Sequence, residues 1–189
     1  MNEHHEYQIS TRQHSDDTLK TYQIGKACEY SRLESHLVEA GYELEEIKAA
    51  KVWIPEGLFT YPYRDKSGHV TRFNTKNPFK VTNNDGQIIK GFSTGAKANY
   101  NSQRLYTDFV IACEGENDLL SLVEAGAKSV IATGGTPSKE QIDGLRIFEK
   151  IYCMFDNDDA GDVDMAKIND LLPDIQVFKI EYDRSFKDP

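Results

Sequence analysis

Apolar runs and amphipathic stretches alternate regularly in the second half of the chain. Strand-type runs fall at 109–113, 129–133, 151–155 and 175–180, and helix-type spacing falls at 118–125, 138–149 and 162–172. This alternation predicts an α/β unit with a mainly parallel four-stranded sheet flanked by helices. Gly126 and Pro173 stand where the first and third helices are expected to stop.

The pattern before residue 106 is different. Residues 1–16 are polar and predict a flexible tail, and three- and four-residue apolar steps in 18–51 predict two short helices. Frequent Pro and Gly, β-type runs and a turn at 65–68 then predict a hairpin. We therefore expect a small mixed α+β lobe over 17–105, with helices and a basic β part. The α/β unit follows it over 106–189.

Composition limits the classes of protein to consider. The chain has 189 residues, 39% hydrophobic and 28% charged, which is enough for a folded core. Its net charge of −9 argues against nucleic-acid binding by the whole surface, so such a role needs a local basic patch or metal ions. No apolar stretch approaches the ~20 residues of a membrane span. We expect a soluble cytoplasmic protein with no membrane partner.

The three cysteines, Cys28, Cys113 and Cys153, are scattered, and no two have C-x-x-C spacing. This spacing indicates neither a disulfide framework nor a zinc site. Cys113 and Cys153 lie inside apolar runs, so both are expected to be buried.

Acidic turns follow two of the predicted strands. Glu114 and Asp118 come after the first strand, and Asp156 and Asp158 come after the third. Because parallel strands end at one edge of a sheet, these carboxylates are expected in one crevice. Asp156 and Asp158 alternate in an extended segment and point the same way, so they need a cation or a shared proton. Mg²⁺ suits a few carboxylates with retained waters.

Several roles stay open on the residues alone. Asp118 could cap the following helix with Glu114 as a first-turn acid, and Asp159 or Asp162 could cap the third helix. Glu116 and Asn117 are expected to be solvated turn residues. The amides of Gly134 and Gly135 precede a helix and could meet a phosphate, or they form a plain loop. Asp188 could bring a further carboxylate to this edge.

Taken in order, these turns resemble the Toprim domain shared by primases, topoisomerases and some nucleases, which has a Glu-Gly-x-x-x-Asp turn and a later Asp-x-Asp. The subtype is similar to bacterial and phage primases and primase-helicases. The segments that carry the likeness are 114–118, 134–136, 155–161 and Lys187-Asp188-Pro189.

That resemblance implies a primase core that makes RNA primers from NTPs on single-stranded DNA, with a replicative helicase fused or associated. By resemblance, the catalytic residues are Glu114, Asp118, Asp156 and Asp158. The ligands of Mg²⁺ or Mn²⁺ are Glu114, Asp156, Asp158 and Asp188.

A weaker resemblance covers about 54–101. Residues 61–70 are similar to the Pro-x-Arg-Asp-x-x-Gly turn of the basic lobe of primases, and 97–102 to its Lys-Tyr-x-Asn-Ser segment. It implies that Arg64 and Lys97 contact template or nucleotide phosphates. Arg72, Lys76 and Arg104 are candidates only by proximity, and the alternative for each cation is an exposed surface charge.

Two other functions stay open. The same carboxylates could cleave phosphodiester bonds in a Toprim nuclease, or the chain could be an inactive module that binds DNA or a partner. A topoisomerase is disfavoured because it needs a catalytic Tyr on another large domain. The sequence carries no zinc module and no Walker A motif, so a fragment of a longer protein is expected.

Overall fold

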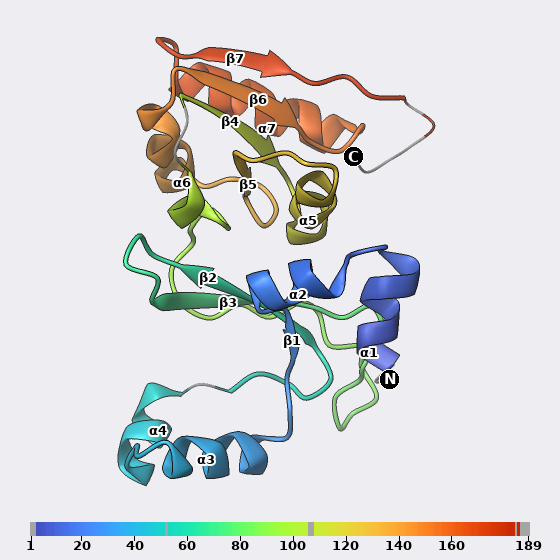
Figure 1. The fold of residues 1–189 in the computed structure, drawn as a ribbon, viewed down its shortest axis with the longest axis vertical. Coiled ribbons are helices and arrows are strands. Elements are labelled where there is room, and N and C mark those ends of the chain that lie inside the picture. Colours follow the sequence, from blue (N-terminus) through green and yellow to red (C-terminus); the bar gives the residue numbers. More distant parts are fainter. Residues whose placement is uncertain (1–2, 52, 106–107, 184, 186–189) are drawn as a thin grey trace.

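The computed structural model describes residues 3–51, 53–105, 108–183 and 185. It contains a three-stranded sheet of order β1-β2-β3 and a four-stranded sheet of order β5-β4-β6-β7 (Figure 1). The strands are β1 Gly25–Lys26, β2 Phe59–Arg64, β3 Val70–Lys76, β4 Phe109–Cys113, β5 Val130–Ala132, β6 Lys150–Met154 and β7 Gln176–Lys179. The helices are α1 Glu3–Glu6, α2 Asp16–Tyr22, α3 Tyr30–Glu39, α4 Leu44–Ala50, α5 Glu116–Glu124, α6 Lys139–Asp143 and α7 Asp159–Leu171.

The predicted α/β unit is confirmed. β4 pairs in parallel with β5 and β6, and β6 pairs in parallel with β7. The helix expected over 138–149 is shorter, because α6 ends at Asp143 and a 3₁₀ turn, Gly144–Ile147, follows it. This tighter turn accompanies the burial of Leu145 and Phe148. We call residues 108–183 the C-terminal unit and residues 3–105 the N-terminal lobe.

The two faces of the four-stranded sheet belong to different apolar clusters. Alternation along β4 sends Val110 and Ala112 to one face and Cys113 to the other. The first face packs side chains of α6, α7 and the 3₁₀ turn, and it includes the buried Cys153. The second face packs α5 together with aromatic residues of the N-terminal lobe, namely Phe59, Tyr61, Tyr63 and Tyr100. The second cluster therefore spans both parts of the molecule. Cys113 and Cys153 are both buried, so the predicted burial of these two cysteines is confirmed.

The backbone also joins the two parts. The amide of Tyr100 donates to the carbonyl of Ala132 at 2.8 Å, and the amide of Ala132 donates back at 3.3 Å. Tyr100 thus pairs with β5, which is the edge strand of the parallel sheet. This bridge fixes the N-terminal lobe against the edge of the sheet.

The predicted flexible tail over 1–16 is wrong for the described residues of that range. They form α1 and a π-helical turn, Tyr7–Thr11, and both Gln8 and His14 are buried. The His14 ring contacts Gln8 Oε1 at 2.9 Å and Ser121 Oγ at 3.2 Å. Gln8 Nε2 donates to the Tyr61 hydroxyl at 3.2 Å. Polar residues can be buried here because each of them has a hydrogen-bond partner.

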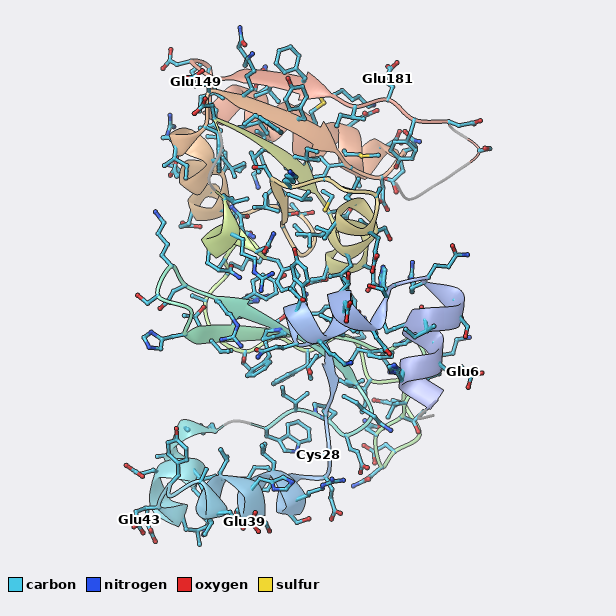
Figure 2. All side chains as sticks on the ribbon, viewed as in Figure 1. Glu6, Cys28, Glu39, Glu43, Glu149 and Glu181 are labelled. Atoms are coloured by element: carbon cyan, nitrogen blue, oxygen red, sulfur yellow. The ribbon has the colours of Figure 1, made fainter. Side chains whose placement is uncertain are left out.

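The helical hairpin of α3 and α4 lies at one end of the molecule, far from the four-stranded sheet (Figure 1). Figure 2 shows Glu39 and Glu43 on this hairpin and Glu149 and Glu181 near the opposite end. Acidic side chains therefore lie at both ends of the long axis. In the part of the chain that the structure describes, no helix is long and apolar enough to cross a membrane.

The buried His14 makes the stability of the fold dependent on pH. Burial lowers the pKa of His14 below its ordinary value of 6.5. As the pH falls below about 6.5, the unfolded chain takes up a proton that the folded protein resists, so stability is lost toward lower pH. We expect the melting temperature of the wild type to fall between pH 7.5 and 5.5 more than that of H14Q. H36Q, at an exposed histidine, serves as control; equal slopes for wild type and H14Q would contradict the prediction.

Candidate functional site

A cleft of about 480 Å³ lies between the N-terminal lobe and the carboxyl ends of β4, β5 and β6. From the C-terminal unit it is lined by Glu114, Gly115, Asn117, Asp118, Gly134, Gly135 and Asp156. From the N-terminal lobe it is lined by Tyr7, Arg12, Phe59, Tyr61, Lys76, Asn77 and Pro78. The crevice that the sequence predicts at this edge therefore exists, and one wall carries carboxylates while the other carries cations.

Glu114, directly after β4, stands at the centre of the acidic wall. Partial burial raises its pKa, and so do, in decreasing order, the charges of Asp156, Asp164, Asp158 and Asp118. A carboxylate whose pKa is raised by neighbouring carboxylates favours a bound cation or a retained proton. The expected gathering of these acids is thus present in the structure.

Asp164 is a member of this group that the sequence interpretation missed. It lies on α7 and is 5% exposed, and burial raises its pKa while a hydrogen bond to Thr136 opposes that change. Its spacing from Gly161 and Ile168 places it on the buried face of the helix. An acid at a core-facing position of an amphipathic helix was the available signal.

Asp156 and Asp158 have different positions and different hydrogen-bonding roles in the structure. Asp156 lines the cleft. Asp158 is exposed and is the N-cap of α7, where its Oδ1 accepts a hydrogen bond from the Gly161 amide at 3.0 Å. The capping role considered for Asp159 or Asp162 therefore belongs to Asp158. The structure gives Asp158 a backbone role in addition to its electrostatic effect on Glu114.

Asp118 also organises the backbone. Its Oδ2 accepts a hydrogen bond from the Gly115 amide at 2.8 Å, so the capping role of Asp118 is confirmed. The first-turn position considered for Glu114 is wrong, because Glu114 precedes the helix and the first-turn acids are Glu116 and Asp118. A Cβ atom at position 115 would lie 2.7 Å from that oxygen, which explains the glycine. Asp118 still lines the cleft.

Gly134 and Gly135 line the cleft, but their amides are already used. Both N–H groups donate to the carbonyl of Glu114, at 2.8 and 3.2 Å. The expected contact of these amides with a phosphate is therefore not supported. Gly134 has φ +71°, and a Cβ atom there would lie 2.6 Å from the Tyr63 hydroxyl. The glycine allows the loop to approach the N-terminal lobe closely.

The cations expected from the weaker resemblance lie outside this cleft lining. Arg64 donates to the carbonyl of Gly68 and to the side chain of Gln23, within its own lobe. Lys97 is exposed and its Nζ lies 3.3 Å from the carbonyl of Thr136. Among the candidates by proximity, Arg72 lies 5.5 Å from the centre of the Tyr63 ring and Arg104 4.7 Å from that of Tyr22.

Two other cations line the cleft. One is Lys76, a candidate only by proximity, and the other is Arg12, which falls in the segment predicted to be a tail. Arg12 Nε donates to the Tyr7 hydroxyl at 3.2 Å, which fixes the side chain against the aromatic wall. The folding of the N-terminal segment is what brings Arg12 to the site.

Glu116 corrects another expectation, because it is fully buried rather than solvated. It accepts hydrogen bonds from the Tyr63 hydroxyl at 2.6 Å and from the Asn74 amide, and it lies 3.3 Å from Lys76 Nζ. Burial opposes its ionisation, but Lys76, Asn74 and Tyr63 outweigh burial and lower the pKa of Glu116. A charged carboxylate is therefore enclosed between the two parts of the molecule.

The oxygen ligands at the cleft suit a hard divalent cation. Within the described ranges, no group of three or more His, Cys, Asp or Glu side chains has a metal-binding arrangement. Mg²⁺ does not require one, since it is often held by one or two carboxylates, waters and substrate phosphates. Glu114 and Asp156 supply such carboxylates. The expected ligand Asp188 lies outside the described residues.

Comparison with known proteins shows what the chain is similar to. Residues 111–189 match the Toprim-like family. A DNA primase of Chlamydia pneumoniae is 24% identical over 180 residues, covering 86% of this chain and 30% of the relative. A DNA primase of Listeria monocytogenes is 26% identical over 181 residues, covering 81% of this chain and 28% of the relative. The chain thus spans less than a third of the length of these relatives.

Solved primase structures share the fold. The RNA polymerase domain of the Mycobacterium tuberculosis primase aligns over 96% of this chain and 68% of its own, with TM-score 0.79 and 18% identity. The zinc-binding and RNA polymerase domains of the Aquifex aeolicus primase align over 98% of this chain and 51% of their own, with TM-score 0.77 and 19% identity. A primase catalytic domain bound to single-stranded DNA aligns over 92% of this chain and 62% of its own, with TM-score 0.68 and 17% identity. The C-terminal unit is similar to Toprim-like domains, and the predicted resemblance and fold class are confirmed.

The glycine that follows the second acidic turn has a steric role. A methyl group at Gly161 would overlap the backbone carbonyl of Asp156, so α7 can approach the turn only if residue 161 is glycine. We expect G161A to lower the free energy of unfolding by about 1–3 kcal/mol, as overpacking does. It should also displace Asp156 and weaken Mn²⁺ binding, measured by titration calorimetry.

G144A is the matched control for G161A. Gly144 has φ −64°, and a Cβ atom there would meet its nearest neighbour at an ordinary 3.9 Å. We expect G144A to be neutral or stabilising by up to about 1 kcal/mol in urea denaturation. Equal effects of the two substitutions would show that the contact with Asp156 is unimportant.

Proposed function

We propose that the chain is the catalytic core of a DNA primase, which joins NTPs into an RNA primer on single-stranded DNA. The observation that carries this proposal is the cleft with Glu114 and Asp156 on one wall and Lys76 and Arg12 on the other. Nucleotidyl transfer needs both groups, because carboxylates serve the cation and the attacking hydroxyl while cations bind the triphosphate. The fold and the primase relatives support the same activity.

Glu114 is proposed to accept the proton of the attacking 3′-hydroxyl. A raised pKa makes a carboxylate a better base at neutral pH, and the environment of Glu114 raises its pKa. Glu114 and Asp156 would hold Mg²⁺ or Mn²⁺, which when bound offsets negative charge on the phosphates. Asp118, Asp158 and Asp164 support these two residues through hydrogen bonds and charge.

The cationic wall is proposed to bind the triphosphate of the incoming NTP. Lys76 and Arg12 face the acidic wall across the cleft, so phosphates between the walls would meet charges of the right sign. Arg64 and Lys97 stay predicted contacts of the DNA template, outside the cleft. Asp188 stays a predicted further ligand.

The cellular setting follows from the same proposal. Such a core would act in the cytoplasm during DNA replication, with a replicative helicase fused or associated. The primase fragment of the bacteriophage T7 primase-helicase, with TM-score 0.58 and 17% identity over 95% of this chain and 65% of its own, has this arrangement by name.

Primer synthesis from labelled NTPs on single-stranded DNA with Mg²⁺ or Mn²⁺ tests the proposal. We expect E114Q and D156N each to reduce synthesis at least about 100-fold, because each removes a group that acts on the reacting atoms. D170N is the matched control, since it removes an exposed carboxylate from α7 away from the cleft. Thermal melts of all variants check that the fold is kept.

Gel analysis of the same reactions distinguishes primer synthesis from DNA cleavage and from binding alone. Full activity of E114Q or D156N would overturn the mechanism. Cleavage of the DNA without NTPs, lost in both variants, would identify a nuclease. Binding of DNA with neither reaction would identify a binding module.

A further inference from the structure

A buried carboxylate, Glu116, lies beside the cleft and has two distinct oxygens. Its Oε1 accepts hydrogen bonds from Tyr63, at 2.6 Å, and from Asn74. Among the described residues, its Oε2 makes no well-aligned hydrogen bond, but it forms an ion pair with Lys76 Nζ at 3.3 Å. Within the described part of the chain, Oε2 therefore depends on the charge of Lys76.

The Lys76 side chain connects this buried anion to the open cleft. Its side chain is 43% exposed and lines the cleft, whereas that of Glu116 is 0% exposed. A lysine side chain has a long flexible stem, so an unpaired ammonium would occupy many positions. The buried partner restricts it, because separating the pair would leave a buried carboxylate without a counter-charge.

We infer that Glu116 is a positioning residue that holds the Lys76 ammonium on the cleft wall, where it binds the triphosphate of a nucleotide. This inference rests on the proposed function only in taking a nucleoside triphosphate as the ligand. The pairing has a second consequence. A lysine that is held by Glu116 competes less for Glu114 and Asp156, which leaves those carboxylates for a cation.

Three substitutions separate this role from a structural one. E116Q keeps an acceptor for Tyr63 and Asn74 but presents an amide N–H₂ group to Lys76, so the hydrogen bonds stay and the charge pair is lost. K76Q removes the charge directly. Y63F is the matched control, since it removes one donor to the same carboxylate and leaves the ion pair intact.

The measurement is the affinity for ATP with Mg²⁺ by titration calorimetry, with thermal melts of the same samples. We expect E116Q and K76Q each to weaken binding roughly tenfold, and the double variant to be no weaker than K76Q, because both remove one interaction. Y63F should stay within about twofold of the wild type. Unchanged affinity in E116Q, or losses that multiply to about 100-fold in the double variant, would overturn the inference.

Primer synthesis by the same proteins distinguishes this inference from the proposed function. Suppose that the wild type binds ATP but makes no primers, and that the double variant binds ATP no more weakly than K76Q. The proposed function then fails and the inference holds. If the wild type makes primers and E116Q binds ATP normally, only the inference fails. If the wild type does not bind ATP, both fail.

A second variant covers the case in which E116Q does not fold. E116D keeps the negative charge, but its side chain is one methylene shorter, so the carboxylate lies farther from Lys76. We expect E116D to weaken ATP binding. The double variant of E116D and K76Q should bind ATP no more weakly than K76Q alone. Wild-type affinity in E116D would then overturn the inference.

Discussion

The structure depends on polar contacts between the N-terminal lobe and α5. Tyr61 donates to Asn117, Tyr63 donates to Glu116, and His14 contacts Ser121. An apolar interface alone would tolerate sliding, because hydrophobic contact has no direction. Hydrogen bonds do have direction, and leaving a buried donor or acceptor unpaired is costly. These contacts therefore allow one relative position of the two parts, and that position defines the cleft.

The same contacts bring together two walls of opposite charge. The acidic wall is built by the ends of parallel strands, whose carbonyls and turns converge at one edge of the sheet. The cationic wall comes from the N-terminal lobe, through Arg12 and Lys76. Neither wall alone brings carboxylates and cations together. A chain with net charge −9 can thus offer phosphates a local cationic surface without a basic exterior.

The fold of the C-terminal unit was predictable because the sequence features that determine each strand, helix and turn lie close to it in the chain. Strand and helix periods, the stops at Gly126 and Pro173, and the acidic turns all lie within a few residues of the features they determine. Glu116 and His14 were not predictable, because their partners lie far along the chain. Glu116 contacts Tyr63, 53 positions away, and His14 contacts Ser121, 107 positions away. A polar residue in a turn or near a terminus shows no local sign that it will be buried.

The acidic turns also show that acids of one motif can have backbone roles. Asp118 and Asp158 each accept a hydrogen bond from a backbone amide at the start of a helix, and the cleft is lined by Glu114, Asp118 and Asp156. A carboxylate that is engaged with an amide has fewer lone pairs for a cation, although its charge still acts at short range. The four acids therefore divide into Asp158, which shapes a turn, Glu114 and Asp156, which line the cleft, and Asp118, which does both. The glycines complete this division, because Gly115 leaves room for the Asp118 carboxylate and Gly161 for the Asp156 carbonyl. The motif therefore specifies backbone geometry as well as acidic side chains at the cleft.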